Sequence, residues 1–144
     1  MNTTALDQLV AYYESLEPRS VERMGQFYAA DCYFKDPFNE VWRLRDIQEI
    51  FLRMYRHLHE PRFRVTGRMV ADDGSGVVLI WDFEFRMKAW RPGVVQRIHG
   101  ITLLRFDAAG KVNYHRDYWD AAEELYEKLP LVGGLMRGLK RYVR

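Results

Sequence analysis

An α+β fold is predicted for this chain, with helices in its first half and strands in its second half. Apolar residues recur at helical spacing in the first half, and from Arg62 onward they alternate with charged residues. The turn sequences DDGSG, RPG and DAAG then divide the second half at hairpin-like intervals. Helices that precede a series of hairpins are expected to cover one face of an antiparallel sheet.

Three helices are predicted in the first half of the chain. The first covers residues 4–17, where a capping box at Thr4 precedes an apolar stripe, and Pro18 ends it. The second is short and ends near Asp31, before the strand-like sequence CYFKD. The third covers residues 45–60, RDIQEIFLRMYRHLHE, and has the clearest amphipathic pattern in the chain.

Four strands are predicted in the second half, near residues 62–72, 76–89, 94–106 and 111–119. In the last strand, alternation puts one set of side chains, His115, Asp117 and Trp119, on one face of the sheet. The opposite face then carries Tyr114, Arg116 and Tyr118. After Pro130, the stretch LVGGLMRGLKRYVR (131–144) is predicted to form a short, basic amphipathic helix.

Length and composition indicate one domain over residues 1–144, since no repeat or low-complexity segment interrupts the chain. A net charge of +2 gives no basis for a nucleic-acid partner. The single Cys32 excludes an internal disulfide, and no metal-site spacing or phosphate-binding loop is present, so neither metal nor cofactor is expected. The N-terminus lacks a signal-peptide pattern and no apolar run reaches the roughly 18 residues of a membrane span. A soluble, cytoplasmic protein is therefore expected.

The order of these elements resembles the nuclear transport factor 2-like superfamily over roughly residues 4–120. The features that carry the resemblance are three N-terminal helices, a short strand ending in Asp36-Pro37, and four antiparallel strands closing with HRDYWD. It implies a cone-shaped fold in which the helices pack on a strongly curved, mainly antiparallel sheet. The superfamily contains ketosteroid isomerases, SnoaL-like polyketide cyclases and limonene epoxide hydrolases, but also binding and interaction domains.

The resemblance to the isomerases implies two roles: Asp36 abstracts a proton, and Tyr12 donates a hydrogen bond to the enolate oxygen. Thr102 takes the place of the protonated acid of the isomerases and is a weaker donor, which counts against steroid isomerisation itself. The cyclases and epoxide hydrolases are similar in the last strand, where Asp117 matches an acid. The Arg-x-Asp strand of the hydrolases has no counterpart, because the chain reads WDFEFRM there.

The same resemblance implies a pocket whose polar members are Tyr12, Asp36, Thr102, His115 and Asp117. Its apolar wall would include Phe34, Trp81, Phe83 and Trp119. Such a wall with a few convergent polar groups suits a flat, hydrophobic ligand that carries one or two oxygens. Desolvation by neighbouring rings would make Asp36 a better base, whereas the alternative is an Asp that only accepts backbone hydrogen bonds in an Asp-Pro turn.

Of the remaining histidines, His57 and His59 are interpreted as structural and His99 as lying outside this pocket. His57 and His59 lie at the end of the third predicted helix, where an imidazole interacts favourably with the helix dipole. His99 alternates away from Thr102.

We therefore expect a small-molecule enzyme of isomerase, cyclase or hydrolase type, acting by proton transfer on a steroid-, polyketide- or terpenoid-like substrate. Asp36 would be the general base and Tyr12 the oxyanion donor, with His115 and Asp117 as a second acid/base pair. Two alternatives stay open: a module that binds an apolar ligand without chemistry, and a protein-interaction domain whose cavity is filled core.

A homodimer is expected as well, because members of this fold commonly pair through the outer face of the sheet. That face would carry Asp82, Glu84, Arg86, Tyr114 and Tyr118. The basic residues of the tail, Arg137, Lys140, Arg141 and Arg144, would suit an anionic membrane surface, but we favour packing of the tail on the domain.

Overall fold

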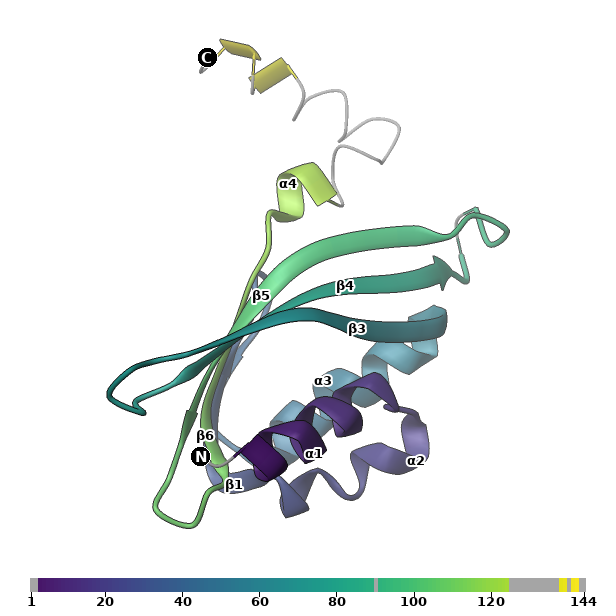
Figure 1. Ribbon diagram of the computed structural model, residues 1–144. Coiled ribbons are helices and arrows are strands. Elements are labelled where there is room, and N and C mark those ends of the chain that lie inside the picture. Colours follow the sequence, from purple (N-terminus) through teal and green to yellow (C-terminus); the bar gives the residue numbers. More distant parts are fainter. Residues whose placement is uncertain (1–2, 90, 125–137, 140, 143–144) are drawn as a thin grey trace.

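One six-stranded sheet curves around the helices of the first half of the chain (Figure 1). The computed structural model describes residues 3–89, 91–124, 138–139 and 141–142. Its elements are, in chain order, α1 (Thr3–Glu14), α2 (Pro18–Val21), a 3₁₀ turn (Met24–Gln26), β1 (Tyr28–Lys35), β2 (Glu40–Val41), α3 (Leu44–His57), β3 (Leu58–Val70), β4 (Val77–Met87), β5 (Gln96–Phe106), β6 (Val112–Tyr118) and α4 (Ala121–Glu124). Helices α1, α2 and α3 lie on the concave side of the sheet, and α4 lies on the other side (Figure 1). The predicted α+β architecture is confirmed.

The sheet is mixed, with the strand order β2-β1-β6-β5-β4-β3. Neighbouring strands are antiparallel except for β1 and β6, which run parallel. This parallel pair, with Phe34 opposite His115 and Lys35 opposite Arg116, joins the first half of the chain to the meander of the second half. The strand that carries the HRDYWD sequence is therefore an interior strand with a neighbour on each side.

The second predicted helix is where the structure differs most from the sequence expectation. Pro18 begins α2 rather than only ending α1, because a proline at the first helical position has no amide hydrogen to leave unpaired. The helix stops at Val21, and a 3₁₀ turn leads into β1, which begins at Tyr28. The apolar residues that suggested a helix up to Asp31 are thus shared between a turn and a strand.

The third helix and the four later strands are confirmed, with one change at their junction. Helix α3 ends at His57, and β3 begins at the next residue, so His59 lies on a strand and not at a helix end. Glu60 has a positive φ of 49°, and the register with β4 shifts beside it. This irregularity is a β-bulge, in which β3 gains one residue relative to β4 just after the strand begins.

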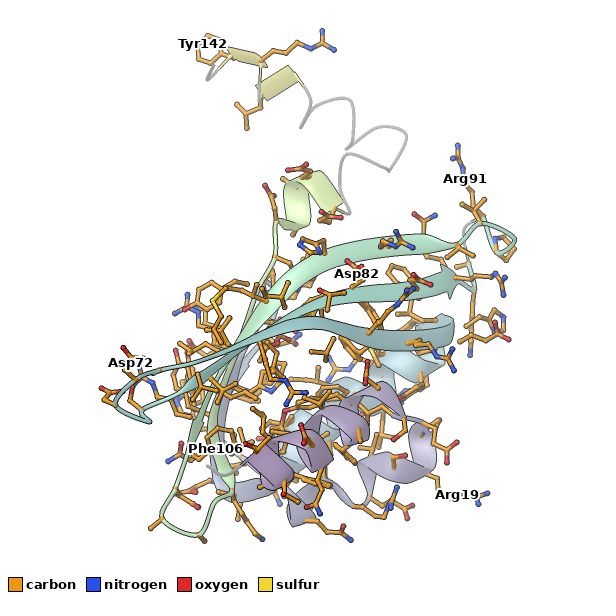
Figure 2. The ribbon with its side chains drawn as sticks, in the orientation of Figure 1. Arg19, Asp72, Asp82, Arg91, Phe106 and Tyr142 are labelled. Carbon is orange, nitrogen blue, oxygen red and sulfur yellow. The ribbon has the colours of Figure 1, made fainter. Side chains whose placement is uncertain are left out.

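Alternation along β4 separates the two faces of the sheet. Trp81 and Phe83 are buried toward the helices, as predicted, and so is Phe85. Asp82 and Glu84 point away from them, and Figure 2 shows Asp82 on that outer side. The outer face carries cross-strand polar contacts: Asp82 and His99 share a hydrogen bond of 2.8 Å, and Glu84 forms ion pairs with one arginine of β3 and one of β5. The exposed position of His99 outside the pocket agrees with the sequence analysis.

The predicted tail helix over residues 131–144 lies mostly outside the described residues. Within it, the structure describes only residues 138–139 and 141–142, which are helical. None of the described helices has the length and apolar character that crossing a bilayer requires.

Candidate functional site

A cavity of about 330 Å³ lies between α3 and the concave face of the sheet. Its wall is mainly apolar, and the aromatic residues that were predicted to line it do so: Phe34, Trp81, Phe83 and Trp119. The exposed ring of Phe38 meets Trp119 edge-on at 5.6 Å between ring centroids and belongs to the same wall. A smaller hollow of about 30 Å³ shares Trp81 and Asp117 with this cavity and is also lined by Thr102.

A chain of hydrogen-bonded side chains runs through the protein to this wall. Its members are, in order, Tyr13, Tyr28, His115, Asp117, Thr102 and Trp81. Its centre is Asp117 Oδ1, which lies 2.8 Å from His115 Nε2 and accepts a hydrogen bond from Thr102 Oγ1 at 2.5 Å. The other carboxylate oxygen, Oδ2, receives no hydrogen bond from the residues that the structure describes. Asp117 also lines the cavity, and its side chain keeps 17% of its surface exposed.

The register of the sheet places these groups together. His115 and Asp117 are two residues apart on β6 and therefore share a face, and Thr102 on β5 is the direct cross-strand partner of Asp117. Trp81 on β4 is paired with Gly100, and its indole Nε1–H reaches Thr102 at 2.8 Å.

Gly100 makes this indole position available. A Cβ atom there would lie 2.6 Å from Trp81 Cη2, 2.8 Å from Trp81 Cζ2 and 3.0 Å from Trp119 Cβ. The indole can therefore lie across the strand only because residue 100 has no side chain. Gly100 was not among the site residues predicted from the sequence, although a glycine inside a predicted strand is a known sign of close approach.

The direction of the hydrogen bonds follows from what each group can donate. An ionised carboxylate only accepts, so His115 Nε2–H donates to Asp117. If His115 Nδ1 is unprotonated, it accepts from Tyr28 at 2.6 Å, and Tyr28 in turn accepts from Tyr13 at 2.5 Å. With the opposite direction, the Tyr13 hydroxyl would have no acceptor among the described residues, and a buried donor without a partner is costly. We therefore assign a neutral His115 that carries its proton on Nε2.

The two tyrosines stay protonated donors over a wide pH range. Burial raises the pKa of Tyr13 and of Tyr28 well above the ordinary value of 10.0, because the charged phenolate would lose its hydration. Both hydroxyls are therefore available to hold His115 in one tautomer at neutral pH.

Tyr12, the predicted oxyanion donor, is not part of this series of hydrogen-bonded side chains. Its hydroxyl donates to the Ser20 carbonyl oxygen at 2.8 Å, and its ring stacks on Phe27 at 4.5 Å. Burial raises its pKa to about 12. It is not among the residues that line the cavity, and Tyr13, the next residue of α1, is the tyrosine that joins the polar chain.

Asp36, the predicted general base, lines the cavity but is engaged by its own turn. Its Oδ1 accepts hydrogen bonds from the backbone N–H groups of Phe38 and Asn39, at 2.8 and 2.7 Å. The Asn39 side-chain amide contacts both carboxylate oxygens at 3.1 Å. These contacts are those of the turn alternative considered from the sequence.

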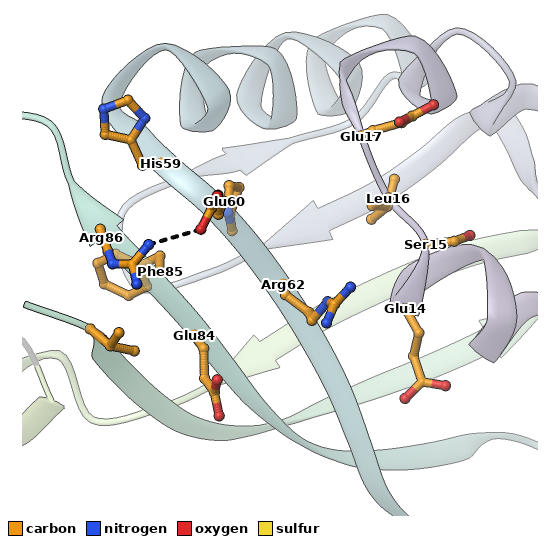
Figure 3. Close-up of a pocket in the computed structure, with 12 residues that line it drawn as sticks. Glu14, Ser15, Leu16, Glu17, His59, Glu60, Arg62, Glu84, Phe85 and Arg86 are labelled. Carbon is orange, nitrogen blue, oxygen red and sulfur yellow. Dashed lines mark hydrogen bonds and ion pairs between the residues drawn. The ribbon is translucent and has the colours of Figure 1, made fainter.

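A separate hollow of about 620 Å³, apart from the two spaces described above, lies between the end of α1 and the ribbon of β3 and β4 (Figure 3). Several of its charged groups have partners in the protein: Arg86 contacts Glu60 at 2.9 Å, and Glu14 accepts a hydrogen bond from the Val65 backbone N–H. It is separate from the polar chain, so the apolar cavity is the better candidate site. Among the described residues, no group of three or more His, Cys, Asp and Glu is arranged to hold a metal ion.

Comparisons with known proteins agree with this architecture. A family model described as a SnoaL-like domain matches residues 9–115. No curated protein matches the chain at a significant level. Among solved structures, a proposed SnoaL-like polyketide cyclase from Shewanella putrefaciens is 23% identical, has a TM-score of 0.68, and aligns over 87% of this chain and 98% of its own.

Two other solved structures carry different names on the same fold. An LEH-like epoxide hydrolase from M. tuberculosis is 16% identical with a TM-score of 0.68, and the match covers 98% of this chain and 96% of the hydrolase. A protein from Catenulispora acidiphila with a ketosteroid isomerase-like fold, solved in complex with trimethylamine, is 16% identical with a TM-score of 0.70. That match covers 87% of this chain and 92% of the other.

At these identities the solved structures show the fold alone, which is the nuclear transport factor 2-like fold expected from the sequence. The family model covers most of the chain, from α1 to the middle of β6. The chain therefore belongs to the SnoaL-like domain family.

Proposed function

We propose that this protein is a cofactor-independent enzyme that moves a proton on an apolar small molecule, with Asp117 as the acid/base group. The observation that carries the proposal is the asymmetric setting of this carboxylate. Oδ1 is anchored by Thr102 and His115, while Oδ2 has no partner among the described residues and belongs to a side chain that lines the apolar cavity. A positioned carboxylate with one oxygen left for the substrate is what general acid–base catalysis requires.

The proposed reaction step is a proton transfer between a substrate carbon and Asp117 Oδ2. The C–H bond breaks, its electron pair stays on the substrate as an enolate, and the O–H bond forms on Asp117. The same proton then returns to the substrate at another atom, or the enolate carbon attacks a carbonyl carbon of the same molecule, whose C=O π electrons become an alkoxide that takes the proton back from Asp117. The first outcome is an isomerisation and the second a cyclisation.

His115 acts in this proposal as a positioning residue and not as a second acid. Its Nε2–H bond to Oδ1 fixes the rotamer of Asp117, and Tyr28 and Tyr13 fix the tautomer of His115. The same bonds stabilise the carboxylate without occupying Oδ2. The Trp81 indole N–H donates to Thr102 and so fixes its hydroxyl, and Gly100 leaves room for the indole.

The proposal departs from the sequence analysis in the assignment of roles. Asp36 and Tyr12 were expected as the base and the oxyanion donor, but their hydrogen-bonding groups have partners within the protein. Asp117 was expected as part of a second pair, and the resemblance to the cyclases left it open as the working acid. Cyclase and epoxide hydrolase names among proteins of the same fold support the broad class of isomerase, cyclase or hydrolase.

A module that binds an apolar ligand without chemistry is the second candidate. The observation that favours it is the wall itself, because most of its residues are apolar and Asp36 and Asn39 satisfy each other. The open cavity of about 330 Å³ counts against the third possibility, an interaction domain with a filled core.

Solvent-deuterium exchange tests the proposal without knowledge of the natural substrate. The probe is 2-tetralone, an apolar bicyclic ketone with acidic α-protons, followed by proton NMR in deuterated buffer. The wild type should accelerate exchange, and Asp117→Asn should lower the catalysed rate by roughly 10² to 10⁴, the usual contribution of a positioned base. Asp36→Asn is the matched control and should retain the rate within about threefold. The assignment fails if Asp36→Asn abolishes exchange while Asp117→Asn does not, and binding of 2-tetralone without exchange by the wild type would favour the binding module.

A further inference from the structure

We infer that the ligand of the apolar cavity carries an anionic group, a carboxylate or a phosphate, which Arg53 and His57 bind at one wall. The inference rests on the cavity of the proposed function and names its substrate class. It starts from the polar side chains that line the cavity: Asp36, Asn39, Arg53, His57 and Asp117.

Three of these five side chains already have partners. Asp36 and Asn39 bond to each other, and Asp117 is anchored by His115 and Thr102. Arg53 and His57, in contrast, have no hydrogen bond or ion pair from their side chains to any residue that the structure describes. The donors of the cavity that remain for a ligand are therefore concentrated on these two residues.

The geometry of α3 explains why both donors belong to the same wall. Residues four apart on a helix lie one turn above another on the same face, which is the spacing of Arg53 and His57. Ile50 and Met54, from the same face of the helix, also line the cavity and supply its apolar surface. Arg56 falls outside this face; it pairs with Glu49 at 2.5 Å and does not line the cavity.

The chemistry of the two side chains selects an anion. A guanidinium presents a rigid fork of N–H donors that matches two oxygens of a carboxylate or phosphate, and it has no acceptor. An imidazole donates one further N–H bond in either tautomer. Both side chains are exposed at the wall. The protein therefore avoids the desolvation cost of burying an unpaired charge before the anion binds.

The position of these donors also fits the proposed reaction. Arg53 and His57 lie on the helix wall, while Asp117 lies on the sheet wall. A ligand with its anionic group on α3 and its apolar body against the rings would be held at one end only. Such an anchor fixes which carbon faces Asp117, and this kind of positioning lowers the entropic part of the barrier.

Calorimetric titration with three naphthalene probes tests the inference. The probes share one apolar body and differ in the head group: naphthalene-2-carboxylate, 2-naphthyl phosphate and the neutral naphthalene-2-carboxamide. In the wild type at constant ionic strength, at least one anionic probe should bind about 10- to 100-fold more tightly than the carboxamide, as expected for a charge-assisted hydrogen bond. The better of the two anionic probes identifies the carboxylate or the phosphate as the preferred group.

Variants of α3 separate a specific anion site from general attraction to a basic protein. Arg53→Gln should remove most of the preference and leave carboxamide affinity within about twofold, and His57→Asn should reduce it by a smaller factor. Arg56→Gln is the matched control, because it removes one positive charge from the same helix outside the cavity and should change neither affinity. Circular dichroism of each variant checks that α3 is intact.

The results distinguish this inference from the proposed function. The anion site is refuted if the wild type binds anionic and neutral probes equally. It is also refuted if the preference for anionic probes survives in the Arg53→Gln, His57→Asn double variant. Neither outcome bears on the proposed function, which 2-tetralone exchange tests separately. Failure of all three probes to bind counts against an apolar ligand in this cavity and so against both proposals. An equal loss of preference in Arg53→Gln and Arg56→Gln would reduce the effect to net charge and also refute the site.

Discussion

Replacing Gly100 with alanine should destabilise the fold and disturb the site together, since the indole of Trp81 occupies the space that the new methyl group needs. The Cβ atom would lie 2.6 Å from Trp81 Cη2, whereas ordinary contact begins near 3.4 Å, so the ring has to move by close to 1 Å. Overpacking of a close-packed interior costs about 1–3 kcal/mol. The movement also weakens the Trp81–Thr102 hydrogen bond of 2.8 Å, which is worth about 1 kcal/mol. The expected loss in the free energy of unfolding is therefore about 2–4 kcal/mol.

Urea unfolding followed by circular dichroism measures this loss, with Gly67→Ala as a control. A Cβ at Gly67 would have its one tight contact, 3.3 Å, with the mobile end of the Ile80 side chain, Cδ1, and the other Ile80 atoms lie at an ordinary 3.8 Å or more, so that variant should stay within about 1 kcal/mol of the wild type. The NMR signal of the Trp81 indole N–H should shift in Gly100→Ala and not in Gly67→Ala. A Gly100→Ala protein as stable as the wild type, with this signal unchanged, would refute the packing argument and with it the role of Gly100.

Three further predictions concern the tyrosines and the outer face of the sheet. Burial raises the pKa of Tyr13 and Tyr28 above 10.0, so the contribution of the two protonated tyrosines to the free energy of unfolding is complete below pH 10. As the pH rises further, this contribution falls by about 1.4 kcal/mol per pH unit for each tyrosine. Urea unfolding at pH 9 and 11 should show the loss, and Tyr28→Phe should make it smaller. The same Tyr28→Phe variant leaves His115 Nδ1 without its donor, so nitrogen NMR should report a changed tautomer balance while the fold is retained, and an unchanged histidine spectrum would contradict the assigned chain. Light scattering at micromolar concentration should give a dimer mass, because the outer face carries exposed rings such as Tyr118, and a monomer mass would exclude this pairing.

The sequence predicted the sheet wall of the site well and the helix wall poorly. Alternation on a strand has a period of two, so one correct assignment on the last strand places His115, Asp117 and Trp119 on the same face. Thr102 and Trp81, on the neighbouring strands, were expected in the pocket from the resemblance to the superfamily. These residues were anticipated for those reasons, and the structure brings them together.

The helix side could not be resolved by the same means. Tyr12 and Tyr13 are both buried on α1, and a pattern that tolerates either of two adjacent residues cannot decide which hydroxyl reaches the site. That choice depends on Tyr28 and His115, which are 87 residues apart in the chain and are joined by the parallel pairing of β1 with β6. Whether Asp36 is available as a base depends likewise on its hydrogen bonds within the turn to Asn39. The Asp36-Pro37 sequence that carries the resemblance does not specify those bonds.

The interior position of β6 has a consequence for how this protein reaches its folded state. Every other strand of the described sheet precedes β6 in the chain, and β6 alone connects β1 and β2 to the β5-β4-β3 meander. Without β6, hydrogen bonding would divide the strands into two partial sheets, β2-β1 and β5-β4-β3. Pairing of β1 with β6, residues so distant in sequence, is slow compared with helix formation, so we expect it to be a late step of folding. The strand that supplies Asp117 thus also closes the molecule, and expression yield and refolding rate should respond to substitutions in β6 more than to those in any other strand.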